Sequence, residues 1–312
     1  MPLNRVLRLA TRGSELALWQ TRRVASLLAI AHPGLEVELV TVSATGDRRA
    51  TVPVWEMGGQ GVFVREVQAA VLNGRADAAV HSAKDLRPVE SDGLCLAAVP
   101  ERADARDVLV GAALWDLPTG AVVATGSQRR RAQLAASRPD LVFEGLRGSI
   151  GARLTKIPPG GAIVVALAAL QRLGLHPGAH EVLSTEVMLP QVGQGALAVE
   201  AREDDAPVLA LLAAIEDPSA RTELEAERAF LATIGGGCDL PVAGHAATTL
   251  DHQLSLEGLL AAPDGRTVVR RLCAGSPAEP VALGGHLANL VLSEGGSELL
   301  AVERQLRQPD GR

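Results

Sequence analysis

Short strand-like segments alternate with amphipathic helices at the start of this chain, and that alternation constrains its fold more than any other feature. Residues 6–11, 37–42 and 77–81 have the apolar patterns of strands. Between them, one helix is predicted to begin at Ser14 and another to cover 64–72. Strands that alternate with helices form βαβ units, so we expect an α/β fold with a mostly parallel sheet.

Two of these strands end in polar stretches that are far apart in the sequence. Thr11-Arg12-Gly13-Ser14 follows the first strand, and His81-Ser82-Ala83-Lys84-Asp85 closes the third. Ligands of open α/β sheets bind at the carboxyl ends of the strands. We therefore expect both stretches to meet at one site.

A similar turn occurs twice. Leu9-Ala10-Thr11-Arg12-Gly13-Ser14 leads into a helix, and Val123-Ala124-Thr125-Gly126-Ser127 leads into another, predicted over 128–136. This weak repeat indicates two similar α/β halves. The alternative is coincidence, because such turns are common.

Breaks in the pattern divide the chain further. A charged run at 101–107 separates the halves, 191–200 is interpreted as a hinge and a returning strand, and a helix over 221–231 precedes hairpin-like strands around Pro263-Asp264-Gly265. We predict domains at 1–99 plus about 196–213, at 100–190, and at 218–312, the last a small α+β domain.

Composition excludes several classes of protein. With 312 residues, 47% of them hydrophobic, the chain can bury two or three cores, and no apolar run is long enough to span a membrane. Arg5, Arg8 and Arg12 interrupt any signal-peptide core. Three scattered cysteines predict no disulfide framework and no metal site. We expect a cytoplasmic protein, with a monomer as the favoured state.

Charge is distributed unevenly along the chain. The formal net charge is -6, which disfavours nucleic acid as a partner. Residues 125–172 nevertheless carry seven arginines and Lys156 against two acids, a local +6, so the remainder carries -12. This segment predicts a local anion site. Arg131 and Arg138 are expected to lie on a solvated face instead.

Arg129 and Arg130 stand in the first turn of a predicted helix, where the helix dipole disfavours cations. Together with the hydroxyls of Thr125 and Ser127 and the free N–H groups of the helix start, they would form a receptor for carboxylates or phosphates. A solvated arginine-rich surface is the equally open alternative.

Other cations occupy comparable places. Arg147 precedes Gly148 at the start of the next predicted helix, and Arg153 follows in its first turns, which favours an anion there. Arg172 lies just before Gly174, where a cation also suits a helix C-terminus for structural reasons.

Lys84-Asp85 is the candidate for acid chemistry. A carboxylate held among cations stays ionised and can balance positive charge that develops in a reaction, so Asp85 is the preferred acid. The alternative is an ordinary surface ion pair. His81, within the same strand, is expected to point into the core.

The three cysteines differ in context. Cys238 lies in a Gly-rich loop, whereas Cys95 has the setting of a small core hydrophobe and Cys273 has no distinguishing context. An accessible loop thiol can act as a nucleophile, but no local base is visible to activate Cys238, and an inert thiol is the alternative.

In order and spacing, these motifs resemble those of the porphobilinogen deaminase family over about residues 6–245. The motifs that carry the resemblance are Thr11-Arg12-Gly13-Ser14, Gly58-Gly59-Gln60-Gly61, Val80-His81-Ser82-Ala83-Lys84-Asp85, Thr125-Gly126-Ser127-Gln128-Arg129-Arg130, Leu146-Arg147-Gly148, Leu170-Gln171-Arg172-Leu173-Gly174, Val192-Gly193-Gln194-Gly195-Ala196 and Gly236-Gly237-Cys238.

The resemblance implies a fold and an activity. It implies two type II periplasmic-binding-protein-like α/β domains with a hinge, followed by a small α+β domain that bears Cys238. It also implies a transferase of tetrapyrrole (haem) biosynthesis that deaminates four porphobilinogen molecules and condenses them head to tail into hydroxymethylbilane. The primer would be a dipyrromethane cofactor joined to Cys238 by a thioether.

Residue roles are implied position by position. Asp85 would be the catalytic residue, stabilising positive pyrrole nitrogens. The residues implied to hold the cofactor are Cys238, Lys84, Asp85, Thr125, Ser127, Arg129, Arg130, Arg147 and Gly148. Those implied to bind substrate and the growing chain are Arg12, Ser14, Gln20, Arg153 and Arg172.

Three positions depart from the family pattern. Many members have lysines where this chain has Glu56 and Gln60, and Gly126 replaces a frequent serine. These changes leave open the part of the Gly-rich loop in covering the cleft and one hydrogen bond to the cofactor. A different class of function is a non-catalytic anion-binding module, as in transport or sensor proteins; the expected lack of a signal peptide and of a DNA-binding segment disfavours it.

Overall fold

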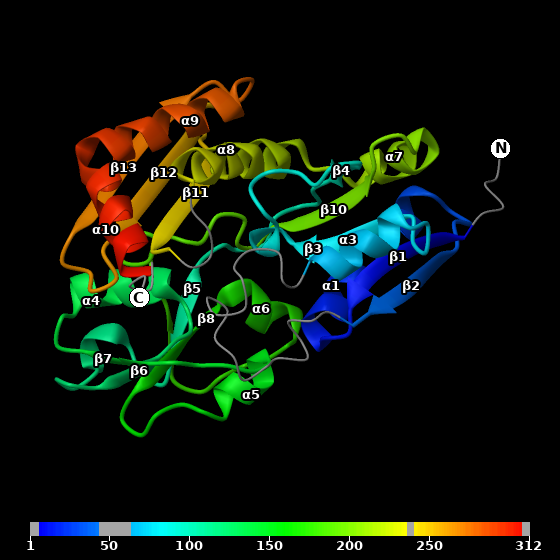
Figure 1. Ribbon diagram of the computed structural model, residues 1–312. Coiled ribbons are helices and arrows are strands. Elements are labelled where there is room, and N and C mark those ends of the chain that lie inside the picture. The colour runs from blue at the N-terminus through cyan, green and yellow to red at the C-terminus, as the bar shows by residue number, and fades with distance from the viewer. Residues whose placement is uncertain (1–5, 44–63, 236–239, 308–312) are drawn as a thin grey trace, which may run out of the picture.

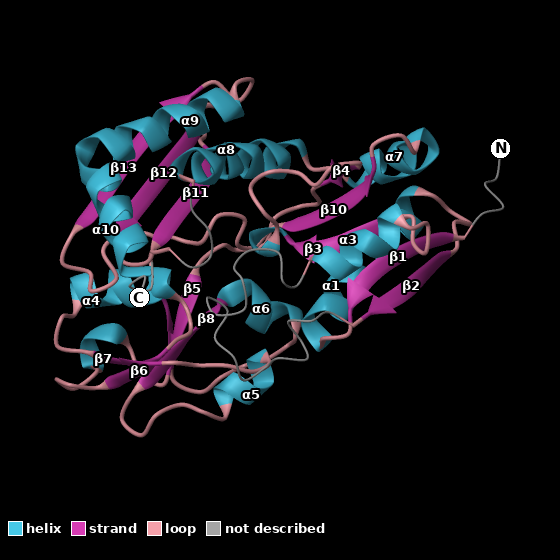
Figure 2. Cartoon of the chain, viewed as in Figure 1, coloured by secondary structure: helices cyan, strands magenta, loops and turns pink. Residues whose placement is uncertain are grey.

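The structure is a computed structural model that describes residues 6–43, 64–235 and 240–307. Its strands form three separate sheets, two of five strands and one of three, each with its own helices (Figures 1 and 2). The predicted architecture is confirmed: two α/β units are followed by a small C-terminal α+β unit.

The first α/β unit begins with the predicted strand and helix. The strand ends at Arg12, and Ser14 caps the helix, its hydroxyl accepting a bond from the N–H of Ala17 at 3.3 Å. Val24 and Leu28 of this helix pack against the sheet. The elements of this unit are β1 (Leu7–Arg12), α1 (Glu15–Ala31), β2 (Val37–Val42), α3 (Arg65–Leu72), β3 (Ala78–Ser82), β4 (Leu94–Ala98), β10 (Leu197–Arg202) and α7 (Ala206–Leu212).

The second α/β unit repeats this plan. Its sheet has the order β7-β6-β8-β5-β9, which matches β2-β1-β3-β10-β4 strand for strand, and Ser127 caps α4 as Ser14 caps α1. The internal repeat predicted from the two turns is therefore present. The elements are β5 (Asp107–Val110), β6 (Val122–Ala124), α4 (Gln128–Ser137), β7 (Val142–Glu144), α5 (Ile150–Leu154), β8 (Ala162–Ala166), α6 (Leu167–Arg172) and β9 (His180–Val182).

One strand in each five-stranded sheet runs against the other four. β1, β2 and β3 are parallel, as are β6, β7 and β8, but β10 runs antiparallel to β3 and β4, and β5 antiparallel to β8 and β9. β5 and β10 are the strands on which the chain passes between the two units, so each enters its sheet from the opposite end. The other four strands of each sheet run in one direction, so the expected mostly parallel arrangement holds except for β5 and β10.

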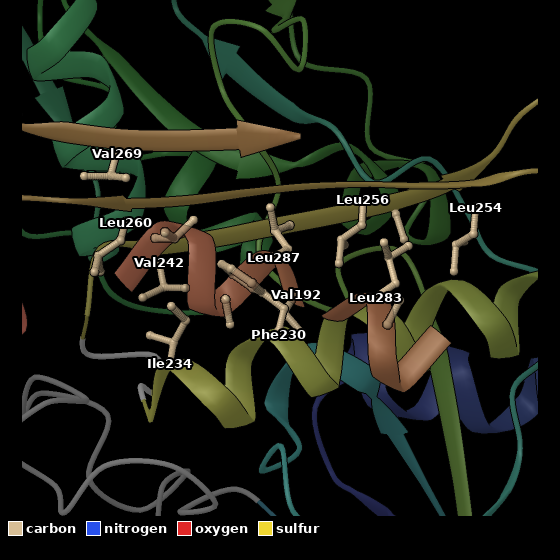
Figure 3. Packing of buried hydrophobic residues seen from close by; sticks show 14 of the residues in the cluster. Val192, Phe230, Ile234, Val242, Leu254, Leu256, Leu260, Val269, Leu283 and Leu287 are labelled. Carbon is tan, nitrogen blue, oxygen red and sulfur yellow. The ribbon is translucent and has the colours of Figure 1, made fainter. Parts of the chain in front are cut away.

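The third unit packs helices on an antiparallel sheet around Phe230, which is fully buried (Figure 3). The Cβ of any other residue at Gly258 would lie 2.6 Å from the Phe230 ring, so glycine lets the ring reach the sheet. The predicted turn at Pro263-Asp264-Gly265 joins the second and third strands. The elements are α8 (Pro218–Ile234), β11 (Val242–Thr248), β12 (Leu254–Ala261), β13 (Val268–Gly275), α9 (Pro280–Val291) and α10 (Ser297–Arg307).

Arg102 ties the three units together at the crossover segments. Its guanidinium donates to the carbonyl oxygen of Gln194 at 3.1 and 3.0 Å and to the buried carboxylate of Glu227 on α8 at 2.8 and 3.1 Å. Glu227 also accepts from the N–H of Gly193 at 2.6 Å. In the described part of the chain, no helix is long and apolar enough to cross a membrane.

Candidate functional site

The two polar stretches of the first unit meet, as predicted. β1 and β3 are parallel neighbours, so their carboxyl ends lie together, and Arg12, Ser14, Gln20 and Asp85 line one pocket there. Gln20 Nε2 donates to the hydroxyl of Ser82 at 2.8 Å, and Arg12 Nη1 lies 3.9 Å from Asp85 Oδ2. The pocket thus places one carboxylate beside one guanidinium.

Lys84 lies next to Asp85 on a short 3₁₀ turn and faces the crossover segment. Its Nζ donates to Gln194 Oε1 at 3.2 Å. Burial and the nearby Arg130 guanidinium lower the pKa of Lys84 to about 8, although Asp85 and Asp107 oppose the shift. Lys84 is therefore a cation that can lose its proton close to neutral pH.

Arg129 and Arg130 begin α4, where sequence analysis placed them, but both are buried against an acid. Arg129 Nη2 donates to Asp107 Oδ2 at 2.7 Å, and Arg130 Nη2 to Asp107 Oδ1 at 2.7 Å. Gln194 Nε2 donates to the same Asp107 oxygen as Arg130, at 2.9 Å. Arg129 Nη1 donates to the carbonyl oxygen of Leu189 at 2.6 Å, and Arg130 Nη1 to that of Val164 at 2.9 Å, whereas Arg129 Nε has no hydrogen-bond partner among the described residues.

Asp107 is thus an internal counter-ion for the pair. Burial opposes its ionisation, but the two guanidinium groups and Gln194 outweigh burial and hold the pKa of this carboxyl well below its usual value. Asp107 is not among the site residues predicted from the sequence. The available signal was an acid heading the apolar strand Asp107-Val108-Leu109-Val110, a place where a charge requires a partner.

Arg147 and Arg153 have different surroundings. Arg153 Nε donates to the carbonyl oxygen of Gly148 at 2.9 Å. Arg147 Nη2 is buried without a hydrogen-bond partner among the residues described. Within the described ranges neither arginine forms an ion pair with a carboxylate. Burial, with the nearby charges of Arg130 and Arg147, lowers the pKa of Arg153 to about 10, against the opposing field of Asp85.

Arg172 closes α6 and reaches back to the first unit. Its Nη2 donates to the carbonyl oxygen of Gly195 at 2.6 Å, and its guanidinium lies 5.8 Å from the centre of the Trp19 ring on α1. Burial lowers the pKa of Arg172 to about 10. This cation therefore lies where the two α/β units approach each other.

The other predicted residues have mixed outcomes. Thr125 accepts a bond from the N–H of Ser127 at 3.2 Å. Arg131 is exposed, as expected, and His81 is buried and pairs with Glu200 at 3.1 Å. The solvated position expected for Arg138 was wrong: its side chain is buried because it donates to the carbonyl oxygens of Leu114 and Leu117 and to Asp140.

Two sets of predictions fall on residues whose structure is not described. Cys238 lies between the described residues 235 and 240, and Glu56 and Gln60 lie between 43 and 64. Cys95 and Cys273 are free thiols, each only partly buried.

Charges link these residues into one cluster. Asp85 acts on Lys84 and Arg153, Arg130 acts on both of these cations, and Arg12 adjoins Asp85. Arginine guanidinium groups bind planar carboxylates through paired donors. Two acids, Asp85 and Asp107, face a larger number of cations, so the arrangement can hold a ligand that carries several carboxylates.

Comparison with known proteins gives the same result over most of the chain. The family model described as "Porphobilinogen deaminase, dipyromethane cofactor binding domain" matches residues 7–210, and "Porphobilinogen deaminase, C-terminal domain" matches 221–293. A protein named porphobilinogen deaminase from Roseiflexus sp. (strain RS-1) is 47% identical over 304 residues, covering 96% of this chain and 100% of the relative.

Relatives of the same name from other bacteria are similarly close. The protein of Nitratidesulfovibrio vulgaris (strain DP4) is 45% identical, covering 94% of this chain and 95% of the relative. That of Acidothermus cellulolyticus is 45% identical, covering 97% and 94%. The chain belongs to the porphobilinogen deaminase family.

Proposed function

We propose that this cleft is the site of a transferase that deaminates four porphobilinogen molecules and condenses them head to tail into hydroxymethylbilane, a linear tetrapyrrole. Family membership over almost the whole chain supports the activity. The observation that carries the assignment to this site is the cluster in which Arg12, Lys84 and Arg153 lie near Asp85, with Arg147 near Arg153, so that cations outnumber acids.

The donor set fits a dipyrromethane cofactor. Each pyrrole of this type bears an acetate and a propionate, so two rings bring four carboxylates. Two features suit such groups. Arg147 Nη2 is buried without a hydrogen-bond partner among the described residues, and Arg153 forms no ion pair with an acid there, although Asp85 lies near enough to act on its charge. We propose that Lys84, Arg147, Gly148 and the start of α4 hold the cofactor, and that Cys238 anchors it by a thioether.

When bound, the cofactor would supply the free pyrrole α-carbon to which the first unit is added, and the terminal ring of the growing chain would supply it for each later unit. The protein supplies charge and position. Asp85 would hold a carboxylate where positive charge develops on a pyrrole nitrogen, and Arg12 Nη1 lies 3.9 Å from its Oδ2. Each addition releases one molecule of ammonia from the incoming aminomethyl group.

The first unit has the groups suited to the incoming substrate. Arg12, Ser14 and Gln20 line its pocket together with Asp85, and Arg153 and Arg172 approach from the second unit. We propose that these five residues bind porphobilinogen and the carboxylates of the growing chain. We also propose a monomer in the reducing cytoplasm, which suits the free thiols of Cys95 and Cys273.

Intact mass spectrometry tests the proposal. The native protein should carry a covalent adduct of two pyrrole units, which Cys238→Ala should lose and the matched control Cys95→Ala should keep. A native chain without adduct that also leaves porphobilinogen unconsumed would favour the anion-binding module instead.

Asp85→Asn tests the catalytic role. The variant keeps the size and shape of the side chain but removes its charge, so the adduct and the fold should remain while turnover falls by about 100-fold or more. Turnover close to that of the unmodified protein would remove Asp85 from this role.

A further inference from the structure

Trp19 and Arg172 join the two α/β units directly. α1 of the first unit contacts α6 of the second (Figure 1). At this contact the Arg172 guanidinium lies over the Trp19 ring, 5.8 Å from its centre, within the range of a cation–π interaction. The Trp19 side chain is 36% exposed, so part of it remains accessible to solvent beside this contact.

No carboxylate forms an ion pair with Arg172 in the described structure. Three features hold it: the Gly195 carbonyl oxygen at 2.6 Å, the C-terminal end of α6, and the indole of Trp19. None of them carries a full negative charge. A partly buried guanidinium in such surroundings remains able to receive a carboxylate.

The contact with the ring does not use the N–H groups of Arg172. Stacking on a ring uses the flat face of a guanidinium, while its N–H groups point outward in the plane. One N–H of Arg172 binds Gly195. The others can bind a ligand while the ring contact persists.

Trp19 also adjoins the pocket of the first unit. Leu16, three residues before it, and Gln20, directly after it, both line that pocket with Asp85. The same turn of α1 therefore contacts Arg172 on one side and faces the substrate pocket on the other.

We infer that Trp19 is a positioning residue for the reaction proposed above: its indole holds the Arg172 guanidinium across the approach of the two units and so presents this cation to carboxylates of the growing chain. The inference rests on the proposed function. It assigns Trp19 no contact with the reacting atoms.

A kinetic test separates this role from a general one in packing. Trp19→Leu removes the aromatic face but keeps an apolar side chain, and should raise KM for porphobilinogen by about 3- to 10-fold with a smaller change in kcat. Trp19→Phe should restore most of the loss. In an Arg172→Gln background, Trp19→Leu should have no further effect on KM. Equal defects in the Phe and Leu variants, or additive effects with Arg172→Gln, would overturn the inference.

The contact itself can be measured without substrate. In a protein whose other tryptophans, Trp55 and Trp115, are replaced by phenylalanine, acrylamide should quench Trp19 fluorescence more strongly after Arg172→Gln, because the ring loses its cover. Arg131→Gln, an exposed arginine of α4, is the control and should change nothing. Unchanged quenching in Arg172→Gln would refute the contact. Failure of the unmodified protein to consume porphobilinogen would refute the proposed function alone.

Discussion

Two pairs of arginines in the second α/β unit have opposite surroundings. Arg129 and Arg130 are buried against Asp107, each with a bond of 2.7 Å to its carboxylate. Arg147 and Arg153 form no ion pair with any acid in the described structure. Both pairs lie in a basic stretch of sequence: Arg129 and Arg130 in the first turn of α4, and Arg147 and Arg153 before α5 and in its last turn. The difference shows that the location of the counter-ion, rather than the arginine, distinguishes a structural cation from one available to a ligand.

The two arrangements have different energetic consequences. A buried charge with a hydrogen-bonded partner is tolerated, and removing the partner is costly. Neighbouring cations without acids repel each other, and a ligand with carboxylates relieves that repulsion. The pair on Asp107 should therefore support the fold, and the other pair should support binding.

Asp107→Asn should have the largest effect. It leaves two buried guanidinium groups with one neutral acceptor, so the free energy of unfolding should fall by about 3–5 kcal/mol. Urea denaturation measures this. The control is Asp104→Asn, which breaks the surface pair with Arg106 and should cost about 0–1 kcal/mol. Similar losses in both variants would contradict the structural role of Asp107.

Arg153→Gln should have the next largest effect, on binding rather than on stability. The loss of charge-assisted bonds to carboxylates should raise KM about 10- to 100-fold. The urea midpoint should stay the same or rise, because repulsion from Arg130 and Arg147 is relieved. Arg131→Gln on the exposed side of α4 is the control. A lower urea midpoint with unchanged KM would show that Arg153 supports the fold and not binding, which contradicts the difference drawn between the two pairs.

Lys84→Arg should raise the pH above which KM for porphobilinogen increases. The pKa of Lys84 is lowered to about 8 from 10.5, so anion binding should weaken as pH rises through about 8. An arginine keeps its charge, and the KM increase should shift to higher pH. Between about pH 8 and 10.5 the unfolded chain binds more protons at Lys84, so this group's contribution to stability rises with pH. Identical KM–pH profiles for the two proteins would show that Lys84 does not set the limit.

Gly126→Ser should have the smallest effect, and it tests a departure from the family pattern. A Cβ at this position would lie 2.9 Å from the carbonyl oxygen of Leu146, so that backbone must shift. We expect a loss of about 1 kcal/mol in urea denaturation and no gain in cofactor retention. A more stable variant would show that the glycine is dispensable.

Local signals predicted local structure well. The cap at Ser14, the limits of α1 and β2, and the repeat of strand, turn and helix are all present. α8 extends to Pro218–Ile234, beyond the predicted 221–231, because Asp217 caps its start and Gly235 its end.

Features that depend on distant partners were missed. β5 and β10 run antiparallel to their neighbours because the chain crosses from one unit to the other on these strands. A local sequence pattern does not indicate such a crossover. The burial of Arg138 depends on carbonyl oxygens more than 20 residues away in the chain. Asp107 escaped notice because its partners, Arg129 and Arg130, lie 22 and 23 residues further along.

A crystal structure of the native protein with its cofactor is the most direct test of the central claim, that cations without internal acids face a carboxylated oligopyrrole. We predict electron density continuous from Cys238 Sγ, with carboxylate oxygens about 2.7–2.9 Å from the guanidinium nitrogens of Arg147 and Arg153. Arg129 and Arg130 should remain ion-paired with Asp107. Density that starts at another cysteine, or carboxylates remote from both Arg147 and Arg153, would contradict it.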